Sequence, residues 1–385
     1  MIIKEVRARV IKDSRGTDTI SVSVNGCEEA SSPNGKSVGD YETRDYYRPL
    51  EFCVKFLNNW DEEIEIERFD DLKIVEKAIS KKLKLIKLRE FGANSLYAFE
   101  SAILKALAHS KKKQLYEIVG DHRKMPHPVG NVVGGGVHSS SISKRPNFQE
   151  FLVIPRSKKF SNDLKAMNYI YSNLKRQLKV KKVNDEGALL VSFDNEEALK
   201  AVAKESKKAE AKFGFKIGIG IDVAASTFFD EGKYNYNGSK VDSAEQYKIM
   251  RYLIDKYSLF YLEDPAEQHD FKGFAKLNKT KCLIVGDDLT ATQYGRVVGA
   301  IRTKAINAMI IKPNQNGSLV ELRNIFGLCR KHGIKTILSH RSGETMDDAI
   351  ADYAVGFGAD YIKCGVGTQW REVKLNRLKE IERNL

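Results

Sequence analysis

Residues 216–222 (KIGIGID) and 259–264 (LFYLED) begin a series of short apolar runs that each end in a chemically reactive side chain. From Glu263 to Lys363 these reactive residues recur every 23 to 28 positions, which is room for one strand, one loop and one helix. Strand–helix units with reactive residues at the strand ends are typical of a (β/α) barrel, where chemistry collects on one face. The other four runs are CLIVGDD (282–288), AMIIK (308–312), TILSH (336–340) and YIK (361–363).

Length and composition describe an ordinary globular protein. With 385 residues, the chain can hold two domains, one of them a barrel of about 250 residues. No apolar run reaches the roughly 20 residues needed to span a bilayer, and residues 1–10 lack the apolar core of a signal peptide. Five cysteines without a CxxC pair favour a reducing compartment. We therefore expect a cytoplasmic protein with no membrane partner.

The net charge of +13 is the unusual feature of the composition. A basic surface attracts nucleic acid or holds anionic metabolites nearby. The lysines, however, are spread through helical stretches such as SKKLKLIK and VAKESKKAEAK, without the interleaved aromatic residues of a single-strand-binding surface. Solvated helix faces are therefore the favoured interpretation, and a nucleic-acid partner is not expected.

The chain changes character near residues 121–128 (DHRKMPHP), which predicts a domain boundary. Before it, residues 2–10 and 19–24 alternate like strands, and residues 48–119 show helical spacing with Asn94 as a candidate N-cap. After it, two strands and two helical stretches precede the repeat. We expect an α+β cap over residues 1–122 and a barrel over residues 123–385.

Three carboxylates, Asp222, Glu263 and Asp287, stand at the ends of three successive predicted strands. In a barrel these are neighbouring positions around the mouth, and Mg²⁺ prefers oxygen ligands of this kind. The alternative is that each acid caps the helix that follows it. Three acids in register favour the metal site.

The other candidates are ambiguous when taken singly. Glu150 lies in the strand FQEFLVIP, and Glu186 lies in the acidic turn NDEGA, which could simply be solvated. Lys312 and Lys363 either extend into solvent or act chemically, and a base needs a depressed pKa from nearby positive charge or burial. His138 lies in a glycine- and serine-rich loop where an exposed histidine is equally expected.

The segment SHRSGET places His340, Arg341 and Ser342 together just after a predicted strand. Arginine suits bidentate capture of a phosphate, and a hydroxyl with loop amides can complete the cradle. These residues favour a phosphorylated substrate.

The order of these motifs resembles the enolase family. The resemblance covers essentially the whole chain and is most specific at SHRSGET. It implies an enolase-type (β/α)8 barrel of the order ββαα(βα)6 with an N-terminal α+β capping domain. The motifs are DSRG (13–16), GANS (92–95), FQEF (148–151), LEDP (262–265), DDLT (287–290), IKPNQNG (311–317), SHRSGET (339–345) and IKCG (362–365).

The resemblance also implies an activity, the Mg²⁺-dependent dehydration of 2-phosphoglycerate to phosphoenolpyruvate in glycolysis and gluconeogenesis. Two Mg²⁺ ions per site are implied, the second arriving with substrate, together with a homodimer or higher homo-oligomer. A lysine base with Mg²⁺ on the developing negative charge is a recognised pattern of this superfamily.

The family pattern gives each candidate a role. The first Mg²⁺ would be held by Asp222, Glu263 and Asp287, and the second by Ser37, which also contacts the substrate. Lys312 would remove the α-proton, and Glu186 with Glu150 would protonate the departing hydroxyl. The other implied site residues are Lys363 on the substrate carboxylate, Arg341 and Ser342 on the phosphate, the substrate contact Gln149, and the histidines His138 and His340.

Several loops depart from the family pattern. GKSVG replaces the usual GASTG and puts Lys36 beside the metal serine, and NDEGA replaces GDEGG around Glu186. GVHSSS replaces the usual histidine loop, and CGVGTQWRE follows Lys363, with Arg371 still matching an arginine. Three hypotheses stay open: a divergent enolase, a paralogue that dehydrates another phosphorylated acid, or a basic enolase-like binding protein that has lost catalysis.

Overall fold

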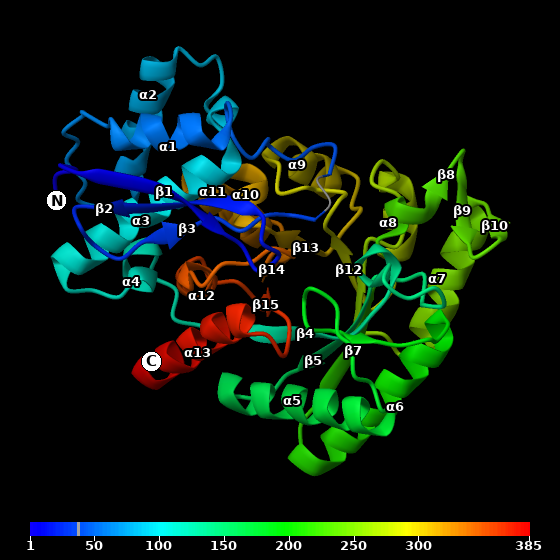
Figure 1. The fold of residues 1–385 in the computed structure, drawn as a ribbon. Helices are drawn as coiled ribbons and strands as arrows, with labels where there is room; N and C mark the ends of the chain where they lie inside the picture. Colours follow the sequence, from blue (N-terminus) through cyan, green and yellow to red (C-terminus); the bar gives the residue numbers. More distant parts are fainter. Residues whose placement is uncertain (37–38) are drawn as a thin grey trace.

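A computed structural model describes residues 1–36 and 39–385 as a strand-and-helix cap beside a barrel (Figure 1). Ser37, the predicted ligand of a second metal ion, lies outside the described residues. None of the described helices combines the length and apolar character needed to cross a membrane.

Eight strands of the described chain close into the barrel, with β15 pairing β4 in parallel to complete the ring. A short extra strand, β6 (Leu189–Leu190), pairs with β4 outside the ring. The ring runs through β4 (His127–Gly134), β5 (Glu150–Pro155), β7 (Ile217–Asp222), β11 (Tyr261–Glu263), β12 (Leu283–Gly286), β13 (Ala308–Ile311), β14 (Lys335–Ser339) and β15 (Tyr361–Lys363).

Helices follow the strands in the order ββαα(βα)6, which confirms the predicted barrel type. The two strands that open the barrel come first, then two helices, and only then the regular alternation. The helices are α5 (Phe160–Gln177), α6 (Asn195–Phe213), α7 (Ser243–Tyr257), α8 (Phe271–Leu277), α9 (Tyr294–Arg302), α10 (Pro313–Asn316), α11 (Leu319–Lys331), α12 (Ala349–Gly356) and α13 (Gln369–Asn384).

The direction of β5 decides which of its ends reaches the barrel mouth. It is antiparallel to both of its neighbours, β4 and β7, whereas the other ring pairs are parallel. The register therefore sets Glu150, the first residue of β5, opposite Asp222, the last residue of β7. An acid at a strand's beginning thus joins acids at the ends of the parallel strands.

The long spacing between Asp222 and Glu263 has a structural cause. A small antiparallel sheet is inserted after β7, before α7 begins at Ser243. It consists of β8 (Phe229–Asp230), β9 (Lys233–Tyr236) and β10 (Ser239–Val241), and a 3-10 turn at Ala225–Phe228 precedes it.

The cap combines an antiparallel sheet, β1-β2-β3, with helices, of which α3 packs against β2 and β3. Asn94 does not cap α3, because this helix begins at Ala93 and Asn94 is fully buried. The cap elements are β1 (Val6–Lys12), β2 (Asp18–Val24), β3 (Ala30–Ser31), α1 (Leu50–Asn58), α2 (Leu72–Leu83), α3 (Ala93–Lys111) and α4 (Leu115–Val119), with 3-10 turns at Phe69–Asp71 and Leu88–Phe91.

Asn94 instead links the cap to the barrel through buried side-chain amides. Its Nδ2 donates to Asn34 Oδ1 at 3.0 Å, and its Oδ1 accepts from Asn314 Nδ2 at 2.9 Å. Cap helices α3 and α4 lie against α10, α11 and α12 of the barrel (Figure 1). The boundary between residues 122 and 123 stays a prediction, since one hydrophobic cluster runs through both parts.

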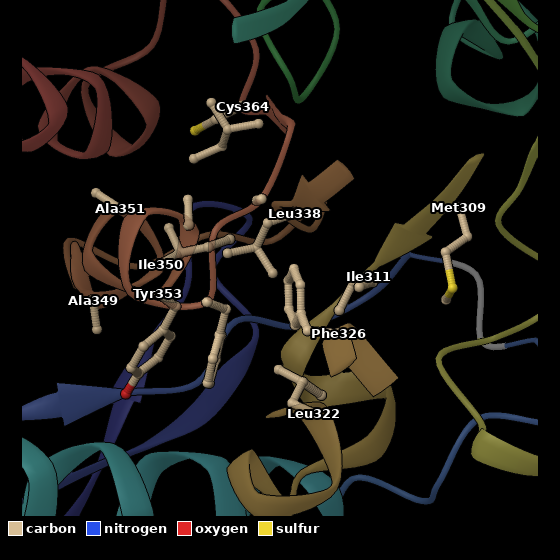
Figure 2. Close-up of a cluster of buried hydrophobic side chains, with 14 of the residues drawn as sticks. Met309, Ile311, Leu322, Phe326, Leu338, Ala349, Ile350, Ala351, Tyr353 and Cys364 are labelled. Atoms are coloured by element: carbon tan, nitrogen blue, oxygen red, sulfur yellow. The ribbon is translucent and has the colours of Figure 1, made fainter. Parts of the chain in front are cut away.

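The barrel wall is held by apolar side chains between its strands and outer helices. Figure 2 shows Ile311 of β13 and Leu338 of β14 near Phe326 of α11 and Ile350 of α12. Burying side chains of this kind contributes about 2 kcal/mol each. This packing fixes the strand ends where the reactive residues stand.

Asp348, just before α12, provides a stability prediction away from the barrel mouth. Burial and the neighbouring Asp347 raise the pKa of Asp348 to about 6, although Lys105 opposes the shift. A raised carboxyl pKa destabilises the fold above that pH, and the penalty disappears as the pH falls towards the unfolded value of about 4. Asp348→Asn should therefore stabilise the protein by about 2 kcal/mol at pH 7.

Urea unfolding of Asp348→Asn and the unmodified protein between pH 4 and pH 7 tests this expectation. The difference between the two free energies of unfolding should shrink towards zero at pH 4. A difference that stays constant across this range would show that Asp348 is not the titrating group.

Candidate active site

A polar cavity lies at the end of the barrel where the parallel strands finish. It gathers nearly all the residues that the sequence singled out. Glu263 does not line it, because this side chain is fully buried beneath Lys363. The predicted residues that line the cavity are His138, Gln149, Glu150, Glu186, Asp222, Asp287, Lys312, His340, Arg341, Ser342 and Lys363.

Lys363 lies among three of the predicted carboxylates. Its Nζ is 2.8 Å from Glu150 Oε2, 2.8 Å from both oxygens of Glu263 and 3.4 Å from Asp222 Oδ2. Burial works against its charge, but these carboxylates prevail and raise the pKa of Lys363 well above its usual value. The ammonium is therefore the cation that these acids share in this structure.

The acids around Lys363 are crowded enough to resist ionisation. Burial, with the charges of neighbouring carboxylates, raises the pKa of Glu150 and that of Asp222 to about 7 each. Burial and Asp222 raise the pKa of Glu263 well above its usual range. One lysine does not neutralise this group of acids, so the cluster can accept further positive charge.

Asp287 forms an ion pair with Lys312 through Oδ2. Burial opposes ionisation of Asp287, but Lys312 and Lys363 outweigh it and lower the pKa of this carboxyl. Burial likewise opposes the charge of Lys312, but Asp287 raises its pKa above the usual value. The sequence argument expected depressed lysine pKa values beside divalent ions and stays a prediction; here the carboxylates are the nearest charges, and they raise the pKa of both lysines.

The geometry gives little support to the alternative that these acids cap the helices that follow them. Helix α8 after Glu263 is capped by Asp270, and helix α9 after Asp287 begins only at Tyr294. Asp222 accepts a bond from the amide of Ala224 at 3.0 Å, within a local turn. Asp287 Oδ1 is buried without a hydrogen-bond partner among the described residues.

Two further acids that the sequence argument missed stand beside Asp287. Oxygens of Asp264, Asp287 and Asp288 lie within 4.8 Å of one another, a spacing that could hold a metal ion. Asp264 also orients this turn, because its carboxylate accepts from the amides of Asp287 at 3.0 Å and Asp288 at 2.7 Å. The sequence signal for these two acids was the pair of adjacent acids in LED (262–264) and in DD (287–288). Among the described residues, Asp222, Glu263 and Asp287 do not form such a group by themselves.

His138, Glu150 and Glu186 form a second group, with ligand atoms within 4.8 Å of one another, and Glu150 also contacts Lys363. His138 Nδ1 is 3.6 Å from Glu186 Oε1. Burial lowers the pKa of His138 to about 4, although Glu150 opposes the shift, so this histidine is neutral near pH 7. It is mostly buried, and the alternative of an exposed histidine is wrong.

The turn that presents Glu186 depends on Gly187. This glycine has φ +90°, and a Cβ there would lie 2.1 Å from the carbonyl oxygen of Val366. Asn184 Oδ1 accepts from the amide of Glu186 at 3.0 Å and holds the turn from the other side. The retained glycine of NDEGA is thus the one this conformation requires.

Arg341 and Ser342, the predicted phosphate contacts, also line the cavity. Arg341 forms an ion pair with Glu42 of the cap at 2.9 Å and donates to Asn314 Oδ1 at 3.0 Å. Ser342 Oγ accepts from Arg15 of the cap at 3.0 Å. Sequence reasoning missed Glu42 and Arg15, whose partners lie hundreds of residues away along the chain.

Arg371 holds His340, Arg341 and Ser342 in position through hydrogen bonds. Its Nε donates to His340 Nδ1 at 3.0 Å, and its Nη2 donates to the carbonyl oxygens of Arg341 and Ser342 at 3.1 and 3.0 Å. Because Nδ1 accepts, the proton of His340 is on Nε2. Burial, then Arg371, lowers the pKa of His340 well below its usual value and keeps the ring neutral.

Comparison with known families identifies the barrel. Residues 122–385 match the family model described as the enolase C-terminal TIM barrel domain. The chain belongs to the enolase family. It is therefore an enzyme, a lyase of the phosphopyruvate hydratase family.

Relatives named enolase match the chain along its whole length. The enolase of Archaeoglobus fulgidus is 35% identical over 401 residues, covering 99% of this chain and 97% of its own. The enolase of Natronomonas pharaonis is 34% identical, covering 100% and 99%. That of Methanothermobacter thermautotrophicus is 33% identical, covering 100% and 97%.

Within this enolase-family site, one departure noted in the sequence, Lys36, and one implied substrate contact, Gln149, can be located. Lys36, which replaces the small residue of the usual loop, lines the cavity and lies 3.3 Å from Asp185 beside Glu186. Gln149 donates to Asp222 Oδ2 at 3.4 Å from the strand opposite. The loop changes therefore leave the reactive groups together in one cavity.

Proposed function

We propose that this chain is a Mg²⁺-dependent enolase that interconverts 2-phosphoglycerate and phosphoenolpyruvate in glycolysis and gluconeogenesis. The supporting observation is that one cavity is lined by Lys312, by Glu150 and Glu186, and by Arg341 and Ser342. A base, an acid and an anion cradle around a single space are the parts that this dehydration needs.

The acidic side of the cavity fits a divalent metal. Asp222, Glu263 and Asp287 would hold the first Mg²⁺, and the crowded carboxyls together with the unpartnered Asp287 Oδ1 support this fit. Such an ion stabilises negative charge on the substrate carboxylate when bound. A second ion, with Ser37 as a ligand, is part of the same proposal.

Lys312 is the proposed base. Removing a proton from carbon next to a carboxylate places negative charge on that carboxylate's oxygens. A divalent ion held by the unpartnered Asp287 Oδ1 would offset the charge of this carboxylate, which is the charge that raises the pKa of Lys312. Lys363, which is buried at the barrel mouth, would accept the substrate carboxylate.

Glu186 is the proposed acid for the departing hydroxyl, with Glu150 as its partner. Hydroxide leaves poorly and needs a positioned proton donor. Burial, with the charge of Glu186, raises the pKa of Glu150 to about 7, so Glu150 can hold a proton near neutral pH beside Glu186. Neutral His138 lies beside Glu186 and adds no competing charge.

The phosphate would lie against Arg341, Ser342 and the Nε2–H of His340. Arginine offers a planar fork for phosphate oxygens. We also propose a homodimer or higher homo-oligomer in the cytoplasm.

Phosphoenolpyruvate formation from 2-phosphoglycerate by purified protein, with Mg²⁺ and with a chelator, tests the proposal. We expect turnover that requires Mg²⁺ and returns when Mg²⁺ is restored. Protein that binds Mg²⁺ but does not turn over 2-phosphoglycerate would instead favour a paralogue acting on another phosphorylated acid.

Arg371→Lys should lower kcat/KM for 2-phosphoglycerate by about 10- to 100-fold, because a lysine cannot reproduce the fork that holds His340 and the Arg341 and Ser342 carbonyls. Steady-state kinetics measures this effect. Arg377→Lys is the matched control, since Arg377 forks onto Asp352 away from the cavity. Equal losses in both variants would show that Arg371 supports only the fold.

A further inference from the structure

A large pocket lies at the opposite end of the barrel from the candidate active site. It has a volume of about 740 Å³ and lies beside the first residues of β7, the residues before β11 and β12, and the residue after β5. Sites for small molecules commonly have volumes of 300 to 1,000 Å³. Nothing in the proposed enolase reaction uses this space.

The walls of this basal pocket carry more positive than negative side chains. Two acids, Glu210 and Asp255, also line it. Lys216 is 4.0 Å from Glu210, and this is the one ion pair of a basic lining residue among residues 1–36 and 39–385. The basic lining residues are Arg156, Lys207, Lys216, Lys279 and Lys281.

Two polar groups lining the pocket lack partners in the described structure. Arg156 Nε is buried without an acceptor, while its guanidinium lies over the Phe260 ring at 4.0 Å. Ser206 Oγ is likewise buried without a partner, and only 1% of this residue is exposed. Unpartnered buried donors are costly, and a ligand oxygen would satisfy them.

Helix ends do not account for these basic residues. Helices α6, α7 and α8 finish on this side of the barrel, and their last turns favour cations. The lysines in those last turns are Lys212, Lys256 and Lys276. None of the three lines the pocket, so its basic side chains form a separate set.

We infer that the basal pocket binds a small phosphorylated molecule. Arg156 provides donors for phosphate oxygens, Ser206 provides a hydroxyl, and Lys279 and Lys281 add charge at the rim. Tyr257 and Phe260 give the wall an aromatic surface for the organic part of the ligand. The site is independent of the catalytic cavity and would account for part of the net charge of +13.

Isothermal titration with inorganic pyrophosphate, at low salt and with a chelator present, tests this inference. The unmodified protein should bind pyrophosphate at two sites, one of which is lost in Arg341→Gln. In the Arg341→Gln background, Lys279→Gln with Lys281→Gln should weaken the remaining site at least tenfold, and Arg156→Gln should do the same.

A charge-matched control separates a local site from general attraction. Lys112→Gln with Lys331→Gln removes the same charge from exposed positions elsewhere and should leave the affinity within twofold. Lys279 and Lys281 are exposed, so their substitution should not disturb folding. The test therefore holds even if Arg156→Gln fails to fold. Equal affinity in the basal and control variants, or a single site already lost in Arg341→Gln, would overturn the inference. The number of pyrophosphate sites and their affinity are both measured without catalytic turnover.

Discussion

Lys312→Ala is expected to lower the rate of phosphoenolpyruvate formation by about 10²- to 10⁴-fold. Lys312 is the proposed base, and a positioned proton-transfer group contributes roughly this much to a rate. The substrate KM should change little by comparison, because the phosphate and carboxylate contacts belong to other residues. Steady-state assay with saturating Mg²⁺ measures the effect.

Lys331→Ala is the control for this variant, since Lys331 is an exposed lysine at the end of α11. It should retain turnover within twofold. Retention of more than a tenth of the activity in Lys312→Ala would contradict the assignment of the base.

Lys363→Met is expected to destabilise the metal-free protein by about 3 kcal/mol, since removing one member of a buried ion pair leaves its partners uncompensated. The partners here are Glu150, Asp222 and Glu263. Mg²⁺ binding to the same acids would restore part of the loss through linkage. Urea unfolding with chelator and with Mg²⁺ measures both effects.

Lys105→Met is the matched control, because Lys105 is also buried and lies 3.0 Å from Asp347, away from the barrel mouth. It should destabilise the protein by a comparable amount. Added Mg²⁺ should increase the free energy of unfolding of Lys363→Met more than that of Lys105→Met. If Mg²⁺ stabilises Lys363→Met no more than Lys105→Met, the acids around Lys363 are not the metal site.

The barrel could be predicted because its evidence is local. Each apolar run ends at a reactive residue, and the strand ends at Asp222, Glu263 and Lys363 coincide with the ends of the runs. The irregular opening was also visible, as two strands before the first helices. Glu150 remained ambiguous, because its place at the mouth depends on the reversed direction of β5.

The rest depends on contacts between distant parts of the chain. Glu42 reaches Arg341 and Arg15 reaches Ser342 from the cap, and neither pairing leaves a periodic signal. Asn94 is a residue type that is common at helix N-caps, but the tertiary structure places it in an amide network. The lysine pKa directions likewise depend on which charge lies nearest, which only the folded chain decides.

Exchange of the C2 proton of 2-phosphoglycerate with deuterated solvent tests the central claim most directly, because it separates the base from the acid. Glu186→Gln should still exchange the proton, while its rate of phosphoenolpyruvate formation falls by about 10²- to 10⁴-fold. Lys312→Ala should neither exchange the proton nor form phosphoenolpyruvate. Exchange at the unmodified rate in Lys312→Ala, or equal loss of exchange and elimination in Glu186→Gln, would contradict the account.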